Sequence, residues 1–296
     1  MVLSGNHRLV DDAIIATTRE GDTMVRNARR TFWTAVMVIA ALVFVCAMAN
    51  LGLIAYSYWS DSNRYDEISD TAFTPAEEVD ALADMKVDWK ALRAINPDVI
   101  AWVYVPDTPI SYPVCWRKDD NQTYLDVNFD GAHGVFTGAG AIFLDGEAKP
   151  DFSCPVNFLF GHHMNDGSMF ACLSDFADAG VFGEHREVYL LTPDYNYQFT
   201  AFALVRTVGT DYLVMHDFAN EAERVKYIAD KEERSLATPD EGSPNPKQMG
   251  KLLALSTCDY NEADGRAVLF ASLVDAVEPA AKASNVVGDA EGYAAG

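Results

Sequence analysis

The longest apolar run of the chain covers residues 32–59, which contain no Asp, Glu, Lys, Arg or His. A helix rises about 1.5 Å per residue, so about 20 such residues cross the apolar core of a bilayer. Trp33 lies near one end of the run, and Tyr56, Tyr58 and Trp59 lie at the other, where they suit the membrane interfaces. The run is too long for a signal peptide, and no small-residue cleavage site follows it cleanly. The pattern predicts an uncleaved transmembrane helix over residues 31–59.

The charges on either side of this run predict its orientation. Arg26, Arg29 and Arg30 precede the run, whereas Asp61 and Asp66 follow it. Basic flanks remain in the cytoplasm. We therefore expect a single-pass protein of the cell membrane, with residues 1–30 as a cytoplasmic tail and the chain beyond the span outside the cell.

The residues after the run change from polar to amphipathic. We expect residues 60–75 to form a polar stalk. Over residues 76–95 apolar positions recur at roughly helical spacing, which predicts a helix. These positions are Val79, Leu82, Val87, Leu92 and Ile95. Residues 276–296 are rich in Ala and Gly and have little to bury, so we expect a disordered tail.

Short apolar runs separated by Gly, Pro, Asn and Asp dominate the chain after Asn96. They read VIAWVYV, ISYPV, AIFL, VNFLF, EVYLL, YQFTAFALVRTV, LLALST and AVLFASLV. This pattern predicts a mainly β domain, closed or sandwich-like, with one helical interruption at 220–234. The roughly 200 central residues are enough for one hydrophobic core.

The charge of the chain excludes one class of partner. The protein has 22 basic and 44 acidic residues, a net charge of −22. All but a few of the acidic residues follow the apolar run. Nucleic-acid binding requires basic patches, so we expect no nucleic-acid partner. Solubility outside the cell explains the negative surface adequately.

The cysteines do not form a dense framework. Cys46 lies inside the apolar run, and Cys115, Cys154, Cys172 and Cys258 follow with no Cys-x-x-Cys pair. No zinc-type ligand spacing is present, and we expect no metal or cofactor. If Cys258 is a free thiol, at most one disulfide can form among the other three.

Two segments carry candidate chemistry. LLALSTCDY (252–260) reads as a buried strand that ends on Cys258, and Arg266 opens the strand that follows a short hairpin. FLFGHHMNDGSMF (158–170) places His162 directly after a strand and a glycine. A nucleophilic thiol needs an acid–base partner, usually histidine, and a group that stabilises the charge of the tetrahedral intermediate. Arginine suits the last role because it is always charged and has several donors.

These residues make the chain similar to the class B sortases. The LSTC segment with a following arginine and the upstream Gly-His element carry the resemblance, and INPDVIAWVYVPDTPISYPV (95–114) and DNQTYL (120–125) agree with it. The resemblance covers residues 76–275, the proposed catalytic domain. It implies a closed eight-stranded sortase-type β-barrel with N-terminal helices, an inserted helix before the cysteine strand and one membrane anchor.

The resemblance also implies a reaction. Cys258 matches the nucleophile, His162 the catalytic histidine and Arg266 the catalytic arginine, while Ser256 and Thr257 are candidates for the substrate groove. The expected substrate is a surface protein or pilin with a C-terminal sorting signal, cleaved after threonine. The acyl group then passes to an amine of peptidoglycan or of a pilin.

One position departs from the family pattern. Class B sortases commonly have Gly-His-Asn-Met, whereas His163 occupies the third place here. Neighbouring residues of an extended segment face opposite sides, so the two histidines cannot both face the thiol. The motif selects His162, and we expect His163 to face away.

Two other classes remain as alternatives. A membrane-anchored binding module without catalysis would retain its function when Cys258 is replaced. Another cell-wall cysteine hydrolase or transpeptidase is the second alternative. The Ser-x-Gly-Cys element of L,D-transpeptidase-like proteins is absent, and a papain-like hydrolase places its cysteine before its histidine.

Overall fold

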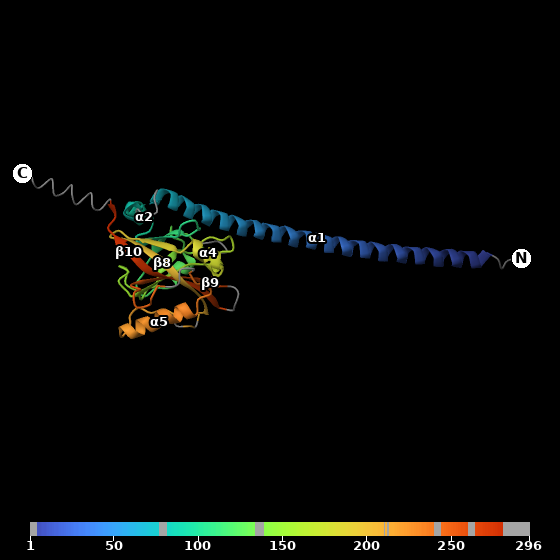
Figure 1. The fold of residues 1–296 in the computed structure, drawn as a ribbon. Helices are drawn as coiled ribbons and strands as arrows, with labels where there is room; N and C mark the ends of the chain where they lie inside the picture. The colour runs from blue at the N-terminus through green and yellow to red at the C-terminus, as the bar shows by residue number, and fades with distance from the viewer. Residues whose placement is uncertain are drawn as a thin grey trace, which may run out of the picture. The chain divides into compact units, whose positions relative to one another are not determined.

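Eight strands close into a single barrel in the computed structural model of this protein (Figure 1). The structure describes residues 5–76, 82–133, 139–209, 211, 213–239, 244–259 and 264–280. The chain divides into two compact units, Met1–Tyr56 and Ser57–Gly296, and the barrel belongs to the second. The predicted closed eight-stranded barrel is confirmed.

The order of the strands around the barrel differs from their order in the chain. The sequence of neighbours is β10-β8-β7-β3-β4-β5-β6-β9, and two of the contacts, β4–β5 and β6–β9, are parallel. Every apolar run predicted as a strand forms one. The strands are β3 Val99–Tyr104, β4 Ser111–Cys115, β5 Ile142–Leu144, β6 Val156–Phe160, β7 Glu187–Leu191, β8 Asn196–Val208, β9 Leu252–Asp259 and β10 Gly265–Val277.

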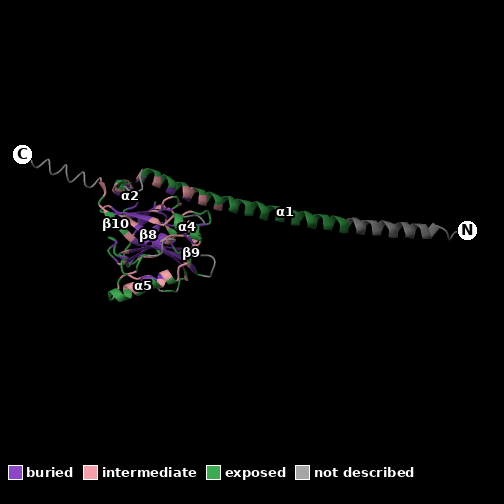
Figure 2. Ribbon diagram, in the orientation of Figure 1, coloured by how far each residue is buried: buried purple, intermediate pink, exposed green. Residues whose placement is uncertain are grey.

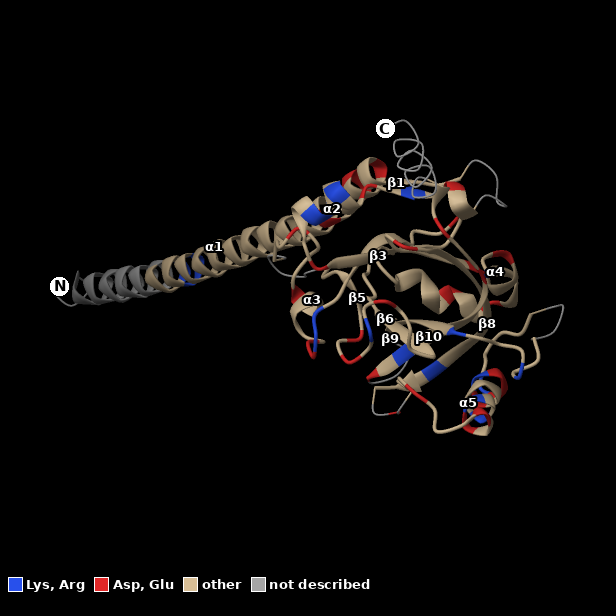
Figure 3. Cartoon of the chain, turned by 90° about the vertical axis from the view of Figure 1, so that its left-hand side faces the viewer, with Lys and Arg blue, Asp and Glu red and all other residues tan. Residues whose placement is uncertain are grey.

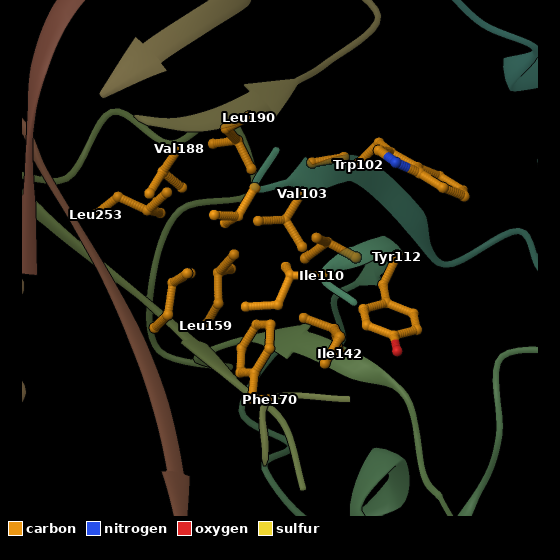
Figure 4. Close-up of a cluster of buried hydrophobic side chains, with 14 of the residues drawn as sticks. Trp102, Val103, Ile110, Tyr112, Ile142, Leu159, Phe170, Val188, Leu190 and Leu253 are labelled. Carbon is orange, nitrogen blue, oxygen red and sulfur yellow. The ribbon is translucent and has the colours of Figure 1, made fainter. Parts of the chain in front are cut away.

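Alternation along the strands divides the buried side chains into two clusters. Leu253 and Leu255 of β9 belong to the main core, which also holds Leu159 of β6. Figure 4 shows Leu159 and Leu253 among apolar side chains contributed by several strands. Leu252 and Ala254 face the other way, into the second cluster. A period of two residues requires this division, because successive side chains of a strand point to opposite faces.

Helix α5 covers the outer face of β9 and its neighbours. It spans Glu221–Glu233, close to the predicted 220–234, and Asn220 caps it by accepting the Glu223 N–H at 3.0 Å. Tyr227 and Ile228 bury the inner side of the helix in the second cluster. Figure 2 shows buried positions concentrated in the strands, with α5 exposed on its outer side.

One long helix, α1, spans Gly5–Ala72. Among the described residues it is the helix long and apolar enough to cross a membrane. Its last turns belong to the barrel unit, although residues 60–75 were expected to be a polar stalk. Tyr65 is 6% exposed, its hydroxyl donates to the Gly140 carbonyl, and it accepts the Phe129 N–H at 3.0 Å. Asp61, four residues earlier, accepts from Asn128 at 3.0 Å. Asp61 and Tyr65 have helical spacing, but the polar residues between them make this spacing hard to recognise in the sequence.

The single helix predicted over residues 76–95 is wrong. Helix α2 spans only Trp89–Ile95, because Asp88 caps it by accepting the Ala91 N–H at 2.9 Å. Before it lie a 3-10 turn, η1 (Leu82–Asp84), and the short strand β2 (Lys86–Val87), which pairs with β1 (Phe73–Thr74). Leu82 and Leu92 are buried as expected, whereas Ile95 is 46% exposed. Val79 lies outside the described residues, as do residues 281–296 of the predicted tail.

Most charged positions lie outside the strands. Figure 3 shows Asp and Glu mainly in the helices and loops, with the barrel strands largely free of them. The remaining short elements also lie outside the barrel wall. They are α3 Thr123–Asp126, the 3-10 helix η2 Ala171–Ala177 and α4 Ala179–Glu184. The negative charge predicted to make the outer domain soluble is thus compatible with an apolar barrel.

Asp120 holds the start of α3. Its carboxylate accepts the Thr123 hydroxyl at 2.6 Å, the Thr123 N–H at 3.0 Å and the Gln122 N–H at 2.9 Å. The Thr123 side chain and these backbone N–H groups lower the pKa of Asp120 to about 2. A carboxyl whose pKa is lower in the folded state stabilises the fold at pH values above its unfolded pKa. This stabilisation is lost as the pH falls and the carboxylate becomes protonated in the folded state.

We predict that Asp120→Ala lowers the free energy of unfolding at pH 7 by about 1 kcal/mol, the usual loss when a side-chain hydrogen-bond acceptor is removed. The difference from the wild type should narrow as the pH falls from about 4 towards 2, because the wild-type carboxylate is then protonated. Urea unfolding at several pH values measures this. The matched control is Asp119→Asn, since Asp119 makes no side-chain hydrogen bond or ion pair among the described residues. A difference that stays constant down to pH 3 would contradict the prediction.

Candidate active site

Cys258 and Arg266 lie directly opposite one another on the antiparallel strands β9 and β10. Opposite residues of such a pair project to the same face, with Cβ atoms about 4.5–5.5 Å apart. Arg266 is on the same face as Val268 and Phe270, which belong to the outer cluster under α5. The predicted arrangement, a thiol that ends one strand and an arginine that opens the next, is therefore present.

His162 reaches the same place through the parallel pairing of β6 with β9. The register aligns Phe160 with Ser256, and the Gly161 N–H then donates to the Ser256 carbonyl at 3.1 Å. Glycine is required at 161. A Cβ there would lie 2.4 Å from Ile142 Cδ1 and 2.7 Å from Phe170 Cδ2. The Gly-His element thus brings the histidine to the end of β9 that carries the thiol.

The ring of His162 is held by a backbone carbonyl. Its Nε2 lies 2.6 Å from the Leu125 carbonyl oxygen. A carbonyl can only accept, so Nε2 carries the proton of this bond, and Nδ1 is the ring nitrogen available for proton transfer. Gly140 allows this approach. Its φ is +59°, and a Cβ there would lie 2.5 Å from the Tyr124 carbonyl and 2.9 Å from the Leu125 carbonyl.

The three predicted residues line one cavity of about 330 Å³. The cavity is mostly apolar, and a minority of its lining residues are polar. Its lining consists of Asn121, Leu125, Phe143, Phe160, Gly161, His162, Gly209, Val214, Ser256, Thr257, Cys258 and Arg266. A concave apolar site with a few converging polar groups is typical of a binding site for a peptide or small molecule.

The two candidate groove residues, Ser256 and Thr257, are both part of this lining but differ in orientation. Ser256 shares the face of Cys258, since the two are separated by one residue along β9. Thr257 belongs to the alternate face, and its hydroxyl oxygen is buried without a hydrogen-bond partner among the described residues. Ser256 and Thr257 are 5% and 2% exposed. Ser256 is therefore better oriented towards a ligand than Thr257.

Arg266 is anchored within its own turn. Its guanidinium lies 3.0 Å from Asp264 Oδ1, and it donates to the Gly265 carbonyl at 2.9 Å. The Asp264 side chain is 56% exposed, and an ion pair so open to solvent contributes little energy. The contact therefore orients Arg266 at the cavity without committing all of its five N–H donors.

His163 does not line the cavity. Its Nδ1 lies 2.9 Å from the Cys258 carbonyl oxygen, so the ring meets the backbone of the cysteine. This geometry is consistent with the expectation that His162 and His163 do not both face the thiol. His163 nevertheless contacts the backbone of Cys258.

The other cysteines of the barrel unit are unsuited to nucleophilic chemistry. Cys115 and Cys154 are buried, and Cys172 is half-buried. Burial raises the pKa of Cys172 to about 12 and that of Cys115 further, so both thiols stay protonated at neutral pH. All five cysteines, which lie within the described residues, are free thiols. In those residues no group of three or more His, Cys, Asp or Glu side chains could hold a metal ion.

Several wall residues were not predicted from the sequence. Asn121 is fixed by two bonds, since its Oδ1 accepts the Gly146 N–H at 2.7 Å and its Nδ2 donates to Asp145 at 3.1 Å. Leu125 contributes the carbonyl that holds His162. Both lie in the DNQTYL segment, which supported the family resemblance but has no reactive side chain. Val214 and Gly209 come from the connection between β8 and α5, for which the sequence has no motif.

Comparison with known proteins identifies relatives of this fold. No family model matches the chain. Sortase B of Listeria monocytogenes is 27% identical over 236 residues, which are 78% of this chain and 92% of the relative. The structure of sortase B from Bacillus anthracis in complex with AAEK1 has a TM-score of 0.61 and 31% identity, over 74% of this chain and 99% of that chain. A Staphylococcus aureus sortase B–substrate complex has a TM-score of 0.56 and 25% identity, over 63% of this chain and 84% of that chain.

These likenesses agree with the closed eight-stranded barrel. Identity above 30% extends over nearly the whole length of a solved sortase B. The alternative of a non-catalytic binding module is not favoured. The chain belongs to the class B sortases, a family of cysteine transpeptidases.

Proposed function

We propose that Cys258, His162 and Arg266 are the catalytic residues of this transpeptidase. The observation that supports this most directly is their convergence. Cys258 faces Arg266 across β9 and β10, the parallel β6–β9 pairing brings His162 alongside, and all three line the same cavity. The protonated state of Cys115 and Cys172 and the burial of Cys154 leave Cys258 as the suitable thiol of the barrel unit.

The first half of the reaction forms a thioester. The sulfur of Cys258 attacks the carbonyl carbon of the threonine in a C-terminal sorting signal, and the thiol proton passes to His162 Nδ1. The tetrahedral oxyanion is stabilised by the Arg266 guanidinium, which presents several donors at fixed geometry. The carbon–nitrogen bond then breaks, and the leaving amine takes the proton from His162. The threonine acyl group remains bound to Cys258.

The second half transfers the acyl group to an amine. A thioester reacts readily with amines and resists water, so the intermediate can persist until an acceptor arrives. The acceptor amine attacks the thioester carbonyl, gives its proton to His162, and releases the Cys258 thiol after that proton returns to sulfur. Peptidoglycan and pilins both present suitable amines, and we assign the acceptor to this class.

A sorting-signal peptide fits the apolar cavity. One related structure is described as a sortase B–substrate complex, and that relationship supports a peptide in the same cavity here. Ser256 shares the face of Cys258 and can contact the substrate, whereas Thr257 contributes mainly through its backbone. The Asn121 side chain is held by two hydrogen bonds, so its amide is a further fixed polar group in the cavity wall.

We predict that Cys258→Ala abolishes the thioester, because a thioester needs a sulfur atom and Cys258 is the one cysteine among the described residues that line the cavity. His162→Ala should be severely impaired. Arg266→Lys should lose on the order of 10²–10³ in rate, since an ammonium does not reproduce the planar donors. The assay is intact-mass detection of the acylated protein with a panel of sorting-signal peptides, with circular dichroism to confirm folding.

Cys172→Ala is the matched control, because it removes a half-buried thiol from a different cavity. It should form the thioester as the wild type does. Retention of transfer by folded Cys258→Ala would contradict the assignment of the nucleophile.

The membrane topology is a separate part of the proposal. Residues 1–30 would lie in the cytoplasm, 31–59 would anchor the protein in the cell membrane, and the catalytic domain at 76–275 would lie outside the cell. The long apolar helix and the arginines before it support this orientation.

We predict that protease treatment of intact cells removes epitopes placed after residue 76 and spares an epitope at residue 10. Permeabilised cells should lose both, which controls for accessibility. Loss of the N-terminal epitope from intact cells would reverse the orientation.

A further inference from the structure

The carbonyl of Cys258 lies where the β6–β9 ladder ends. Along this parallel edge, the Ser256 carbonyl accepts the Gly161 N–H at 3.1 Å. The next carbonyl of β9 on the same edge, two residues on, belongs to Cys258. At that point β6 has already ended at Phe160. The Cys258 carbonyl meets the Nδ1 atom of His163 at 2.9 Å instead of a backbone N–H.

The geometry of this contact determines where the proton is. A carbonyl oxygen only accepts, so Nδ1 of His163 must donate. The Ser174 hydroxyl lies 3.4 Å from the same nitrogen, which is at the outer limit of a hydrogen bond. The neighbouring His162 donates from its other nitrogen, Nε2, to Leu125. Two consecutive histidines thus donate from opposite ring nitrogens to two different backbone carbonyls.

The loop that carries His163 is itself firmly held. Residues 163 and 169 form an antiparallel bridge, and the Phe170 N–H donates to the His162 carbonyl at 2.9 Å. The Met169 N–H donates to the Tyr112 hydroxyl at 2.9 Å, which ties the loop to β4. A donor on such a support can fix its acceptor in space.

We propose that His163 is a positioning residue for the nucleophile. Its Nδ1–H extends the β6–β9 ladder by one bond beyond the last backbone pair and fixes the backbone of Cys258. β10 flanks the other edge of β9, where Arg266 is the register partner of Cys258. This inference rests on the proposed function, in which Cys258 attacks the substrate. An error of about 1 Å in a reacting group can cost about 10²-fold in rate, so a strand end held on both edges matters for this reaction.

The chemistry of the contact specifies which replacements can restore it. In asparagine the Nδ2 atom is bonded to Cγ, as Nδ1 is in histidine, so an amide at this position can donate to the same carbonyl. Leucine has a similar size and no donor. Comparison of His163→Asn with His163→Leu therefore isolates the donor from the bulk of the side chain.

The test measures kcat and KM for thioester formation by the full-length chain in detergent. The substrate is whichever peptide of a sorting-signal panel the wild type cleaves fastest. We expect His163→Leu to lower kcat by about 10- to 100-fold with KM changed less than about twofold, as for a misplaced reacting group. His163→Asn should restore kcat to within about threefold of the wild type. The loss of kcat expected for His163→Leu is larger than the loss expected if His163 only faced away from the thiol.

Asn165→Ala serves as the matched control on the same loop. Asn165 is exposed, and its amide donates to the Tyr58 hydroxyl at 3.4 Å and not to the Cys258 carbonyl. It should leave both constants unchanged. If His163→Leu does not fold, His163→Asp replaces it, because a carboxylate of the same reach as asparagine cannot donate at neutral pH.

The proposal would be overturned by wild-type kcat in the variant without a donor, or by equal impairment of the asparagine and leucine variants. Inactive His163→Leu together with near wild-type His162→Ala would also overturn it, since the histidines would then have exchanged roles. Cys258→Ala in the same assay distinguishes a failure of the proposed function from a failure of the proposed role of His163. Thioester formation by that variant would refute the proposed function itself, whatever the His163 variants do.

Discussion

The parallel pairing of β6 with β9 is the constraint on which the site depends. These strands are about 95 residues apart in the chain, yet their register aligns Phe160 with Ser256 residue by residue. A shift of one residue would turn every side chain of β9 to the other face. Leu253 and Leu255 fill the barrel and Leu252 and Ala254 fill the outer cluster, so the two cores fix the register and thereby the face on which Cys258 lies.

Backbone carbonyls then assign different tasks to similar side chains. The Leu125 carbonyl takes the Nε2 proton of His162, and the Cys258 carbonyl takes the Nδ1 proton of His163. Neither acceptor can change its role with pH, because a carbonyl never donates. The site therefore contains two neighbouring imidazoles that donate from different ring nitrogens, and of the two only His162 lines the cavity. Gly140 makes room for the His162 contact, and Gly161 packs closely against Ile142 and Phe170.

The sequence alone predicted the strands, and it predicted that the proposed site residues lie close together, because both follow from local patterns. Strand positions follow from apolar runs of the right length, and a hairpin forces Cys258 and Arg266 into proximity. The helix expected over 76–95 failed because Asp88 starts a new helix and residues 86–87 find a partner strand, β1, which periodicity alone cannot reveal. The helical contacts of Asp61 and Tyr65 were missed since polar residues surround them. Leu125 acts through its backbone, which leaves no signal in a side-chain motif.

Transfer of an acyl group from Cys258 to an amine is the central claim, and one measurement tests it most directly. The full-length chain is incubated with a panel of sorting-signal peptides, with and without triglycine, and both protein and peptides are followed by mass spectrometry. The account predicts a thioester that maps to Cys258 without triglycine. With triglycine it predicts a new peptide–triglycine product and a smaller fraction of acylated protein. Peptide hydrolysis at an unchanged rate with no triglycine product, or an adduct that maps to another residue, would contradict it.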